Sequence, residues 1–418
     1  MREMGFMEKL LDGVRVEWLR LGEIGELVRG NGLPKTDFTE NGVPAIHYGQ
    51  IYTYYGNETV QTLSFVSSET AKKLKKVNKG DVVITNTSEN LEDVGKALLY
   101  LGEAQAVTGG HATIFKPDPK ILGKYFVYCT QHSFFFDAKR KLAKGTKVID
   151  VSATDMAKIK FPIPCPDNSK KSLEIQAEIV RILDAMTAHT AELTAELTAR
   201  KKQYDYYRDK LLSFEDDVYE FPLSDICTSI ADGDHQAPPQ TSTGINFVTI
   251  SNISKNGFID FSKTKYVPDD YYKNLASKRK PRFGDVLYTV VGSIGIPVFI
   301  DFEKEFTFQR HVAILRFKTE LVNPKYVFHF MRSRIFFNKA NSVAMGAAQK
   351  TITLGTLGKL KISLPSLERQ NNIVAILDKF DSLANSITDG LPREIELRQK
   401  QYAYYRDLLL SFPAAQAA

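Results

Sequence analysis

Side chains that can pair with base edges or neutralise phosphates gather between the expected β-strands of this 418-residue chain. Histidine, glutamine and tyrosine offer donors and acceptors to base edges, and arginine and lysine offer charge to phosphates. A histidine before a β-rich segment occurs twice, as His111 and His311, although a single histidine is as often a hydrogen-bonded structural residue. The candidates for nucleic-acid contact are Tyr52, Tyr55, His111, Arg140, Lys141, Lys144, His235, Gln236, Arg279, Lys280, Gln309, Arg310, His311 and Lys350.

The sequence lacks motifs for catalysis or nucleotide binding. No glycine-rich phosphate loop is followed by Lys-Ser or Lys-Thr. Asn323-Pro324-Lys325-Tyr326 is superficially like the Asn-Pro-Pro-Tyr motif of amino-methyltransferases, but its third residue is lysine and no glycine-rich cofactor motif precedes it. We therefore predict a chain with no catalytic residues, which depends on another chain for any catalysis.

Composition is that of a globular protein, with 43% hydrophobic and 25% charged residues. The net charge of +6 is compatible with a nucleic-acid partner but is weak evidence for one. Three distant cysteines suit neither a metal site nor a disulfide framework, and the amino terminus lacks the apolar stretch of a signal peptide. We expect no metal in this chain and a cytoplasmic location in a bacterium or archaeon.

The elements that must position the candidates occur twice. Residues 203–214 recur as residues 401–412 with ten of twelve positions identical, and fainter matches follow in the same order at an offset near 200. A repeat of this kind predicts two copies of one structural unit. The predicted segments are 1–14 (packing with the carboxy-terminal helix), 15–166 (first globular domain), 167–214 (central helix), 215–366 (second globular domain), 367–412 (carboxy-terminal helix) and 413–418 (tail).

Each globular domain is expected to be of the α/β (α+β) class, with β-rich segments and one helix near 121–139 or 324–340. The expected strands are Asp81–Asn86, Val94–Leu101 and Ala112–Phe115, with Asp285–Val291, Pro297–Ile300 and Val312–Phe317 in the second copy.

The two long helices are predicted from apolar residues at helical spacing. No glycine or proline lies between Ser172 and Phe214, whereas Gly390 and Pro392 predict a break in the second helix. Such helices need partners, so we expect them to pack on each other as an antiparallel, coiled-coil-like spacer. The residues assigned to the spacer or to partner contact are Leu193, Leu197, Tyr204, Tyr207, Arg208, Tyr402, Tyr405 and Arg406.

A short echo at the amino terminus suggests how the copies are joined. Glu8–Asp12 resembles Asp209–Ser213, the end of the first long helix. We expect residues 1–14 to lie beside the carboxy-terminal helix, which gives a circular arrangement with pseudo-two-fold symmetry.

Two near-identical helix ends that separate two diverged globular domains resemble the specificity subunit of type I restriction–modification enzymes, over the whole chain. The doubled Thr-Ala-Glu-Leu at residues 190–197 is similar to that of the IC subfamily, where the number of copies sets the gap between half-sites. The resemblance implies that each globular domain is a target recognition domain, which reads one half of a bipartite asymmetric DNA sequence.

The resemblance also implies the partners. Double-stranded DNA, two modification (methyltransferase) subunits and the motor-nuclease restriction subunits would bind this non-catalytic chain. S-adenosylmethionine, ATP and Mg²⁺ would sit on those partner subunits. The alternatives left open are a duplicated DNA-binding regulator or architectural protein without enzyme partners, and a coiled-coil scaffold with no nucleic-acid role.

Overall fold

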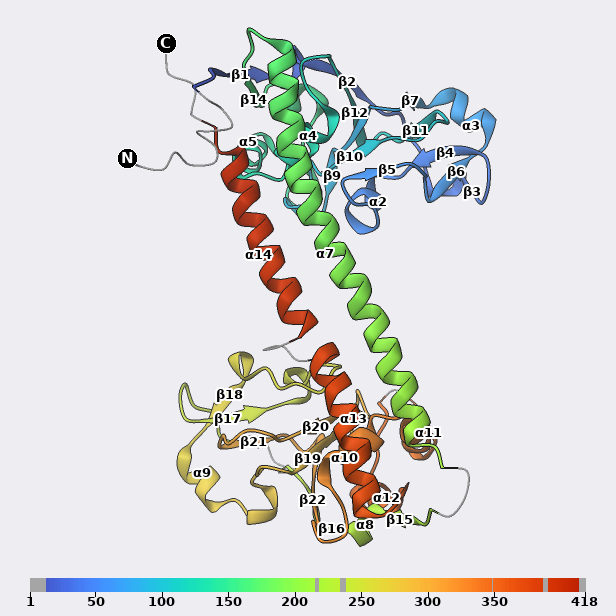
Figure 1. The fold of residues 1–418 in the computed structure, drawn as a ribbon, viewed down its shortest axis with the longest axis vertical. Coiled ribbons are helices and arrows are strands. Elements are labelled where there is room, and N and C mark those ends of the chain that lie inside the picture. The colour runs from blue at the N-terminus through green and yellow to red at the C-terminus, as the bar shows by residue number, and fades with distance from the viewer. Residues whose placement is uncertain (1–12, 215–217, 234–237, 348, 386–389, 413–418) are drawn as a thin grey trace. The chain divides into compact units, whose positions relative to one another are not determined.

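The computed structural model describes residues 13–214, 218–233, 238–347, 349–385 and 390–412. The chain divides into two compact units (Figure 1). Unit 1 comprises Met1–Ala191 with Leu397–Ala418, and unit 2 comprises Glu192–Glu396. Among the described residues, no helix is long and apolar enough to span a membrane.

The main sheet of unit 1 has the strand order β2-β12-β8-β10-β5, and a second sheet has the order β3-β6-β4-β11-β7. Neighbouring strands run antiparallel, except that β5 is parallel to β10 and β4 to β11. Two further pairs are β1 with β14 and β13 with β9. The strands are β1 (Val16–Arg20), β2 (Gly25–Arg29), β3 (Phe38–Thr39), β4 (Val43–Ile46), β5 (Glu58–Thr59), β6 (Ser64–Val66), β7 (Lys75–Val77), β8 (Val82–Thr85), β9 (Thr87–Ser88), β10 (Ala97–Tyr100), β11 (Ala106–Thr108), β12 (Ala112–Pro117), β13 (Ile149–Asp150) and β14 (Lys160–Pro164).

Unit 2 repeats this topology, with fewer strands among its described residues. Its sheets have the orders β16-β22-β19-β20 and β18-β17-β21, and β15 pairs with β23. Here β17 is parallel to β21, as β4 is to β11. The strands are β15 (Glu220–Pro222), β16 (Cys227–Asp232), β17 (Ile245–Val248), β18 (Lys265–Val267), β19 (Val286–Thr289), β20 (Pro297–Phe299), β21 (Phe306–Phe308), β22 (Val312–Phe317) and β23 (Lys361–Ser363).

The central strands are apolar throughout because both faces of each main sheet are covered. In β8, Val82 and Ile84 pack into the cluster that holds the helices, and Val83 packs toward the second sheet. In β19, Val286 and Leu287 divide between two clusters in the same way. The mixed α/β class predicted for each domain is therefore confirmed.

The expectation of one helix near 121–139 and one near 324–340 was wrong, because each region holds two helices. A new helix starts where a side chain caps it: His132 accepts a hydrogen bond from the Phe134 amide, and Ser333 accepts one from the Phe336 amide. The short helices are α2 (Tyr48–Thr53), α3 (Ser68–Lys73), α4 (Gly123–Cys129), α5 (Ser133–Leu142) and α6 (Ala153–Met156) in unit 1, and α8 (Leu223–Ile226), α9 (Asp269–Asn274), α10 (Pro324–Met331), α11 (Arg334–Val343) and α12 (Leu354–Lys359) in unit 2.

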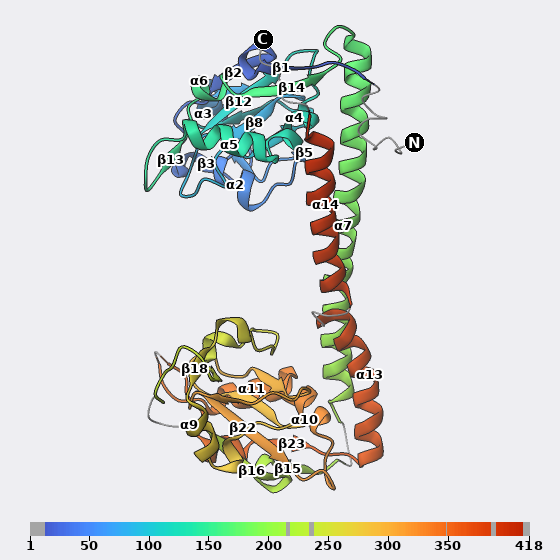
Figure 2. The ribbon, with the colours of Figure 1, turned by 90° about the vertical axis from the view of Figure 1, so that its left-hand side faces the viewer.

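The long helices agree with the sequence pattern. Helix α7 runs without interruption over Ser169–Leu211, and the second long helix is divided into α13 (Leu367–Asn385) and α14 (Leu391–Leu410). The predicted break lies at Gly390, whose φ of 86° is left-handed and favours glycine. In unit 1, the start of α7 and the end of α14 lie side by side and run in opposite directions (Figures 1 and 2).

The circular arrangement is closed within unit 1. Leu409, Leu410 and Phe412, at the end of the chain, are buried in the same core cluster as Leu21 and Ile24 from its beginning. Of the amino-terminal segment 1–14, Val14 packs against this cluster, and residues 1–12 lie outside the described part of the chain.

Candidate nucleic-acid interface and helix seats

Each unit holds the beginning of one long helix through a buried glutamine. The Gln176 side chain accepts a hydrogen bond from the Leu122 amide at 2.9 Å and donates one to the Lys120 carbonyl at 2.9 Å. In unit 2, Gln370 accepts from the Asn323 amide at 2.8 Å and donates to the Leu321 carbonyl at 3.4 Å. The duplicated Leu-Glu-x-Gln sequence therefore fixes each helix to its own globular domain.

Two turns further along, an aspartate repeats the attachment. Asp184 of α7 forms an ion pair with Lys124 at 2.9 Å, and Asp378 of α13 forms one with Lys325 at 2.8 Å. The units differ in the next residue. Tyr128 donates its hydroxyl directly to Asp184 at 2.5 Å, whereas unit 2 has His329 in that place, with Nε2 2.8 Å from Asp378. We call the cluster around Tyr128 in unit 1 and around His329 in unit 2 the helix seat of that unit.

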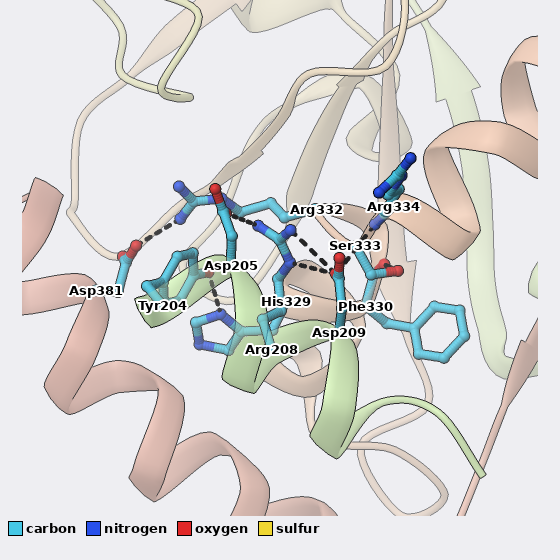
Figure 3. A network of polar contacts seen from close by, with 10 residues as sticks. All are labelled: Tyr204, Asp205, Arg208, Asp209, His329, Phe330, Arg332, Ser333, Arg334 and Asp381. Atoms are coloured by element: carbon cyan, nitrogen blue, oxygen red, sulfur yellow. Dashed lines mark hydrogen bonds and ion pairs between the residues drawn. The ribbon is translucent and has the colours of Figure 1, made fainter. Parts of the chain in front are cut away.

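The end of the other long helix contacts the helix seat through a tyrosine. In unit 2, Tyr204 of α7 lies 3.1 Å from Nδ1 of His329 (Figure 3). Because the carboxylate of Asp378 only accepts, Nε2 of His329 donates to it and Nδ1 accepts from the Tyr204 hydroxyl. In unit 1, the equivalent Tyr402 of α14 donates to the Gln131 side chain at 2.8 Å. Each seat thus binds the start of one helix and the end of the other.

An arginine one turn after that tyrosine completes the seat. Arg208 is buried, contacts Asp205 at 2.7 Å and Asp209 at 3.0 Å, and lies over the Tyr204 ring (Figure 3). Arg332 lies over the same ring and pairs with Asp381 at 2.6 Å. In unit 1, Arg406 pairs with Asp407 at 2.8 Å and lies over Tyr402.

The residues predicted for the spacer or for partner contact differ in whether their side chains are buried or exposed. Tyr204, Arg208, Tyr402 and Arg406 are directed into their own units, and Leu193 and Leu197 are half-buried. The predicted residues Tyr207 and Tyr405 are exposed. The sequence reasoning missed the most exposed pair, Tyr206 at 60% and Tyr404 at 65%, although both lie in the duplicated motif.

The histidine of unit 2 predicts a loss of stability in mild acid. Burial lowers the pKa of His329, so the unfolded chain takes up a proton below about pH 6.5 that the folded chain does not. The free energy of unfolding should therefore fall between pH 7.5 and 5.5. Burial would raise the pKa of Asp378, but His329 and Lys325 outweigh it and lower that pKa, so Asp378 does not titrate in this window.

Thermal unfolding of the full chain at the two pH values measures this effect. The variant His329→Gln can keep both hydrogen bonds and cannot ionise, so its melting temperature should depend less on pH. A remaining dependence is expected from His47, His132 and His311, whose pKa values are also lowered by burial. Equal pH dependence in both proteins would contradict the role given to His329.

In unit 1, His111 lies among other polar and aromatic side chains at the start of β12. Its Nδ1 is 2.8 Å from the Thr87 hydroxyl, and its ring is 4.8 Å from that of Tyr48, which in turn lies 4.6 Å from His47. We call these four residues and the adjoining turn 144–150 the His111 surface. The turn is included in this surface because Asp150 pairs with Thr87 between strands β13 and β9.

His311 occupies the equivalent place in unit 2. Its carbonyl accepts a hydrogen bond from the Val290 amide at 2.9 Å, as that of His111 accepts one from Asn86 at 2.8 Å. Gln309 and Arg310 precede it, and Arg310 is exposed. We call these three residues and the turn 345–351 the His311 surface, since Thr351 bridges to Val291.

The two turns are closed by the same backbone hydrogen bonds and carry different side chains at their described residues. Residues 144 and 150 exchange backbone hydrogen bonds, as do residues 345 and 351, and Gly145 and Gly346 have φ values of 96° and 100°. The first turn carries Lys144, which pairs with Asp155 at 3.0 Å yet is largely exposed. The second carries Lys350, which donates to Asn341 at 2.6 Å.

The remaining candidates do not all gather on these surfaces. Tyr52 and Tyr55 line a cavity of about 410 Å³ together with Arg406. The side chains of Arg140 and Lys141 are exposed at the last turn of α5. Local contacts occupy two others: Arg279 lies 3.9 Å from Asp232, and Lys280 donates to the Lys273 carbonyl. His235 and Gln236 lie outside the described residues.

Comparison with known proteins gives a consistent match. The family model for the type I restriction modification DNA specificity domain matches twice, at residues 14–200 and 215–397. The chain is 36% identical to the Escherichia coli type I restriction enzyme EcoR124I/EcoR124II specificity subunit, over 99% of this chain and 98% of that protein. It is 32% identical to a putative type I restriction enzyme specificity subunit of Haemophilus influenzae, over 97% and 98%.

Solved structures share the fold. A chain from a study of complex assembly and conformational transition of the type I R-M system gives a TM-score of 0.62 at 15% identity, covering 94% of this chain and 97% of that one. The S subunit of a type I restriction-modification system from M. genitalium gives a TM-score of 0.53 at 13% identity, covering 97% and 98%.

Proposed function

Because this chain belongs to the family of type I restriction–modification DNA specificity subunits, we propose that each of its units reads one half of a bipartite, asymmetric DNA target. A subunit of this family recognises DNA sequence within a restriction–modification complex and is itself non-catalytic. The duplicated seats support the proposal. Their glutamine and lysine–aspartate contacts are kept in both units, whereas the His111 and His311 surfaces carry different side chains around the shared histidine. A common support with two different surfaces suits two different half-sites.

The duplicated exposed tyrosines support a proposal for the partners in the complex. Tyr206 and Tyr404 occur in the same motif at the ends of the long helices, so one kind of partner can bind twice. We assign these positions to two modification subunits, with restriction subunits joining the full complex. S-adenosylmethionine, ATP and Mg²⁺ would belong to those subunits, and the assembly would work in the cytoplasm.

The purified chain is expected to show neither methylation nor cleavage of DNA, and to enable methylation when its modification subunit is added. Transfer of labelled methyl groups to duplex DNA measures this, with the modification subunit alone as the control. Activity of the purified chain would contradict the proposal. Failure to co-purify with a methyltransferase would instead favour a DNA-binding regulator.

A further inference from the structure

The turn that follows β8 in unit 1 is longer than the turn that follows β19 in unit 2. The turns have matching ends: the Gly95 amide donates to the Thr85 carbonyl at 2.9 Å, and the Gly295 amide donates to the Thr289 carbonyl at 3.0 Å. Nine residues separate the first pair and five separate the second, so unit 1 has four extra residues. We call residues 86–94 the long loop.

The long loop has a defined internal structure. Asn90 and Asp93 exchange hydrogen bonds at 2.8 Å, and the Thr85 hydroxyl donates to the Asp93 carbonyl at 2.7 Å. At its start, Asn86 accepts from the Thr113 hydroxyl at 2.8 Å. Glu89, Asn90 and Glu92 are exposed at its tip.

A buried lysine on a neighbouring helix holds the backbone of this loop. Nζ of Lys139, on α5, donates to the Glu92 carbonyl at 3.1 Å and to the Val94 carbonyl, and the residue is 4% exposed. Burial lowers the pKa of Lys139 to about 8, so the amine is mostly charged at neutral pH. Because Phe135 aligns with Phe336, the equivalent of Lys139 in unit 2 is Ala340, which is 1% exposed. The unit with the short turn therefore has no such amine at this position.

The long loop also borders the His111 surface. Thr87 belongs to both, since its hydroxyl contacts His111 and its backbone pairs with Asp150. A change in the loop's position would shift carboxylate and amide side chains relative to His111. Such groups accept hydrogen bonds from the exocyclic amine of cytosine or adenine in the major groove.

We propose that the long loop is a base-reading element found in unit 1 and not in unit 2, and that Lys139 is the positioning residue that holds it. The base it reads offers an exocyclic amine, as cytosine and adenine do. This inference rests on the proposed function, because it assumes that unit 1 reads one half-site.

The test uses the complex of the full chain with its modification subunit. In Lys139→Met, which keeps the aliphatic stem, methylation should lose preference at one position of one half-site by about tenfold, with the other half unchanged. Lys139→Arg should restore that preference, because it keeps a charged donor. The matched control Lys339→Met removes a half-buried amine, which pairs with Glu220, from the neighbouring position in unit 2, and should leave both halves unchanged.

A second variant tests the loop without changing Lys139, in case Lys139→Met fails to fold. Deleting residues 89–92 gives the loop the length of its unit 2 counterpart, and should relax the same position. Methylome sequencing measures preference at each base, and a lysine that only stabilised the fold would lower methylation without changing preference. Unchanged preference in both variants overturns the inference. A wild-type complex that methylates no bipartite target overturns the proposed function, and the inference with it.

Discussion

Inserting a third Thr-Ala-Glu-Leu directly after Leu197 is expected to lengthen the gap between the half-sites and to leave both half-sites unaltered. Helix α7 is continuous through the repeat, and the boundary between the compact units falls inside it, between Ala191 and Glu192. Four helical residues add about 6 Å and rotate the following helix by about 400°, which is close to a full turn. The base-pair spacing along one strand is about 3.4 Å, so the gap should grow by one to about two base pairs.

Methylome sequencing of strains that carry either chain measures this gap directly. A matched control inserts Ala-Ala after Leu197, which adds about 3 Å but rotates the following helix by about 200°. That control should weaken or abolish methylation. An unchanged gap in the four-residue insertion would refute the role of the repeat as a spacer.

Exchanging residues 15–150 for the recognition domain of another specificity subunit is expected to replace one half-site entirely and preserve the other. This segment carries the His111 surface and the long loop, whereas α7 and α14 stay in place. The donor domain must keep the seat, because Tyr128 and Gln131 hold Asp184 and Tyr402. A donor domain that lacks these side chains should fail to support methylation because the helix contacts are lost, not because DNA recognition is lost.

The recovered target separates these outcomes. One new half-site beside one old half-site supports independent reading by each unit. A change in both halves would show that the unit boundaries are wrong, and the double variant Tyr128→Phe with Gln131→Leu, which leaves the His111 surface intact, tests the seat alone.

The long helices could be predicted from the sequence because their evidence is local. Ile175 and Ile179 recur at helical spacing, glycine and proline are absent until the chain leaves α7, and Gly390 marks the break. Burial confirms the helical spacing, because Ile175, Ile179 and Leu183 are all buried. Identity between residues 203–214 and 401–412 revealed the duplication without any structure.

The seats could not be predicted because their partners lie far apart in sequence. Tyr204 meets His329 across 125 positions, and Tyr402 meets Gln131 across 271. The duplicated tyrosine and arginine therefore looked like partner-binding residues, although both turn into their own units. Lys139 was passed over for its exposed neighbours Arg140 and Lys141, because a basic run does not reveal which side chain is buried.

The most direct test of the account is single-molecule methylome sequencing of a strain that expresses this chain with its modification subunit, beside a strain that expresses the modification subunit alone. The account predicts methylation at one bipartite motif, with two different half-sites and a fixed gap, only when this chain is present. Methylation at an uninterrupted motif, or the same methylation without this chain, would contradict it.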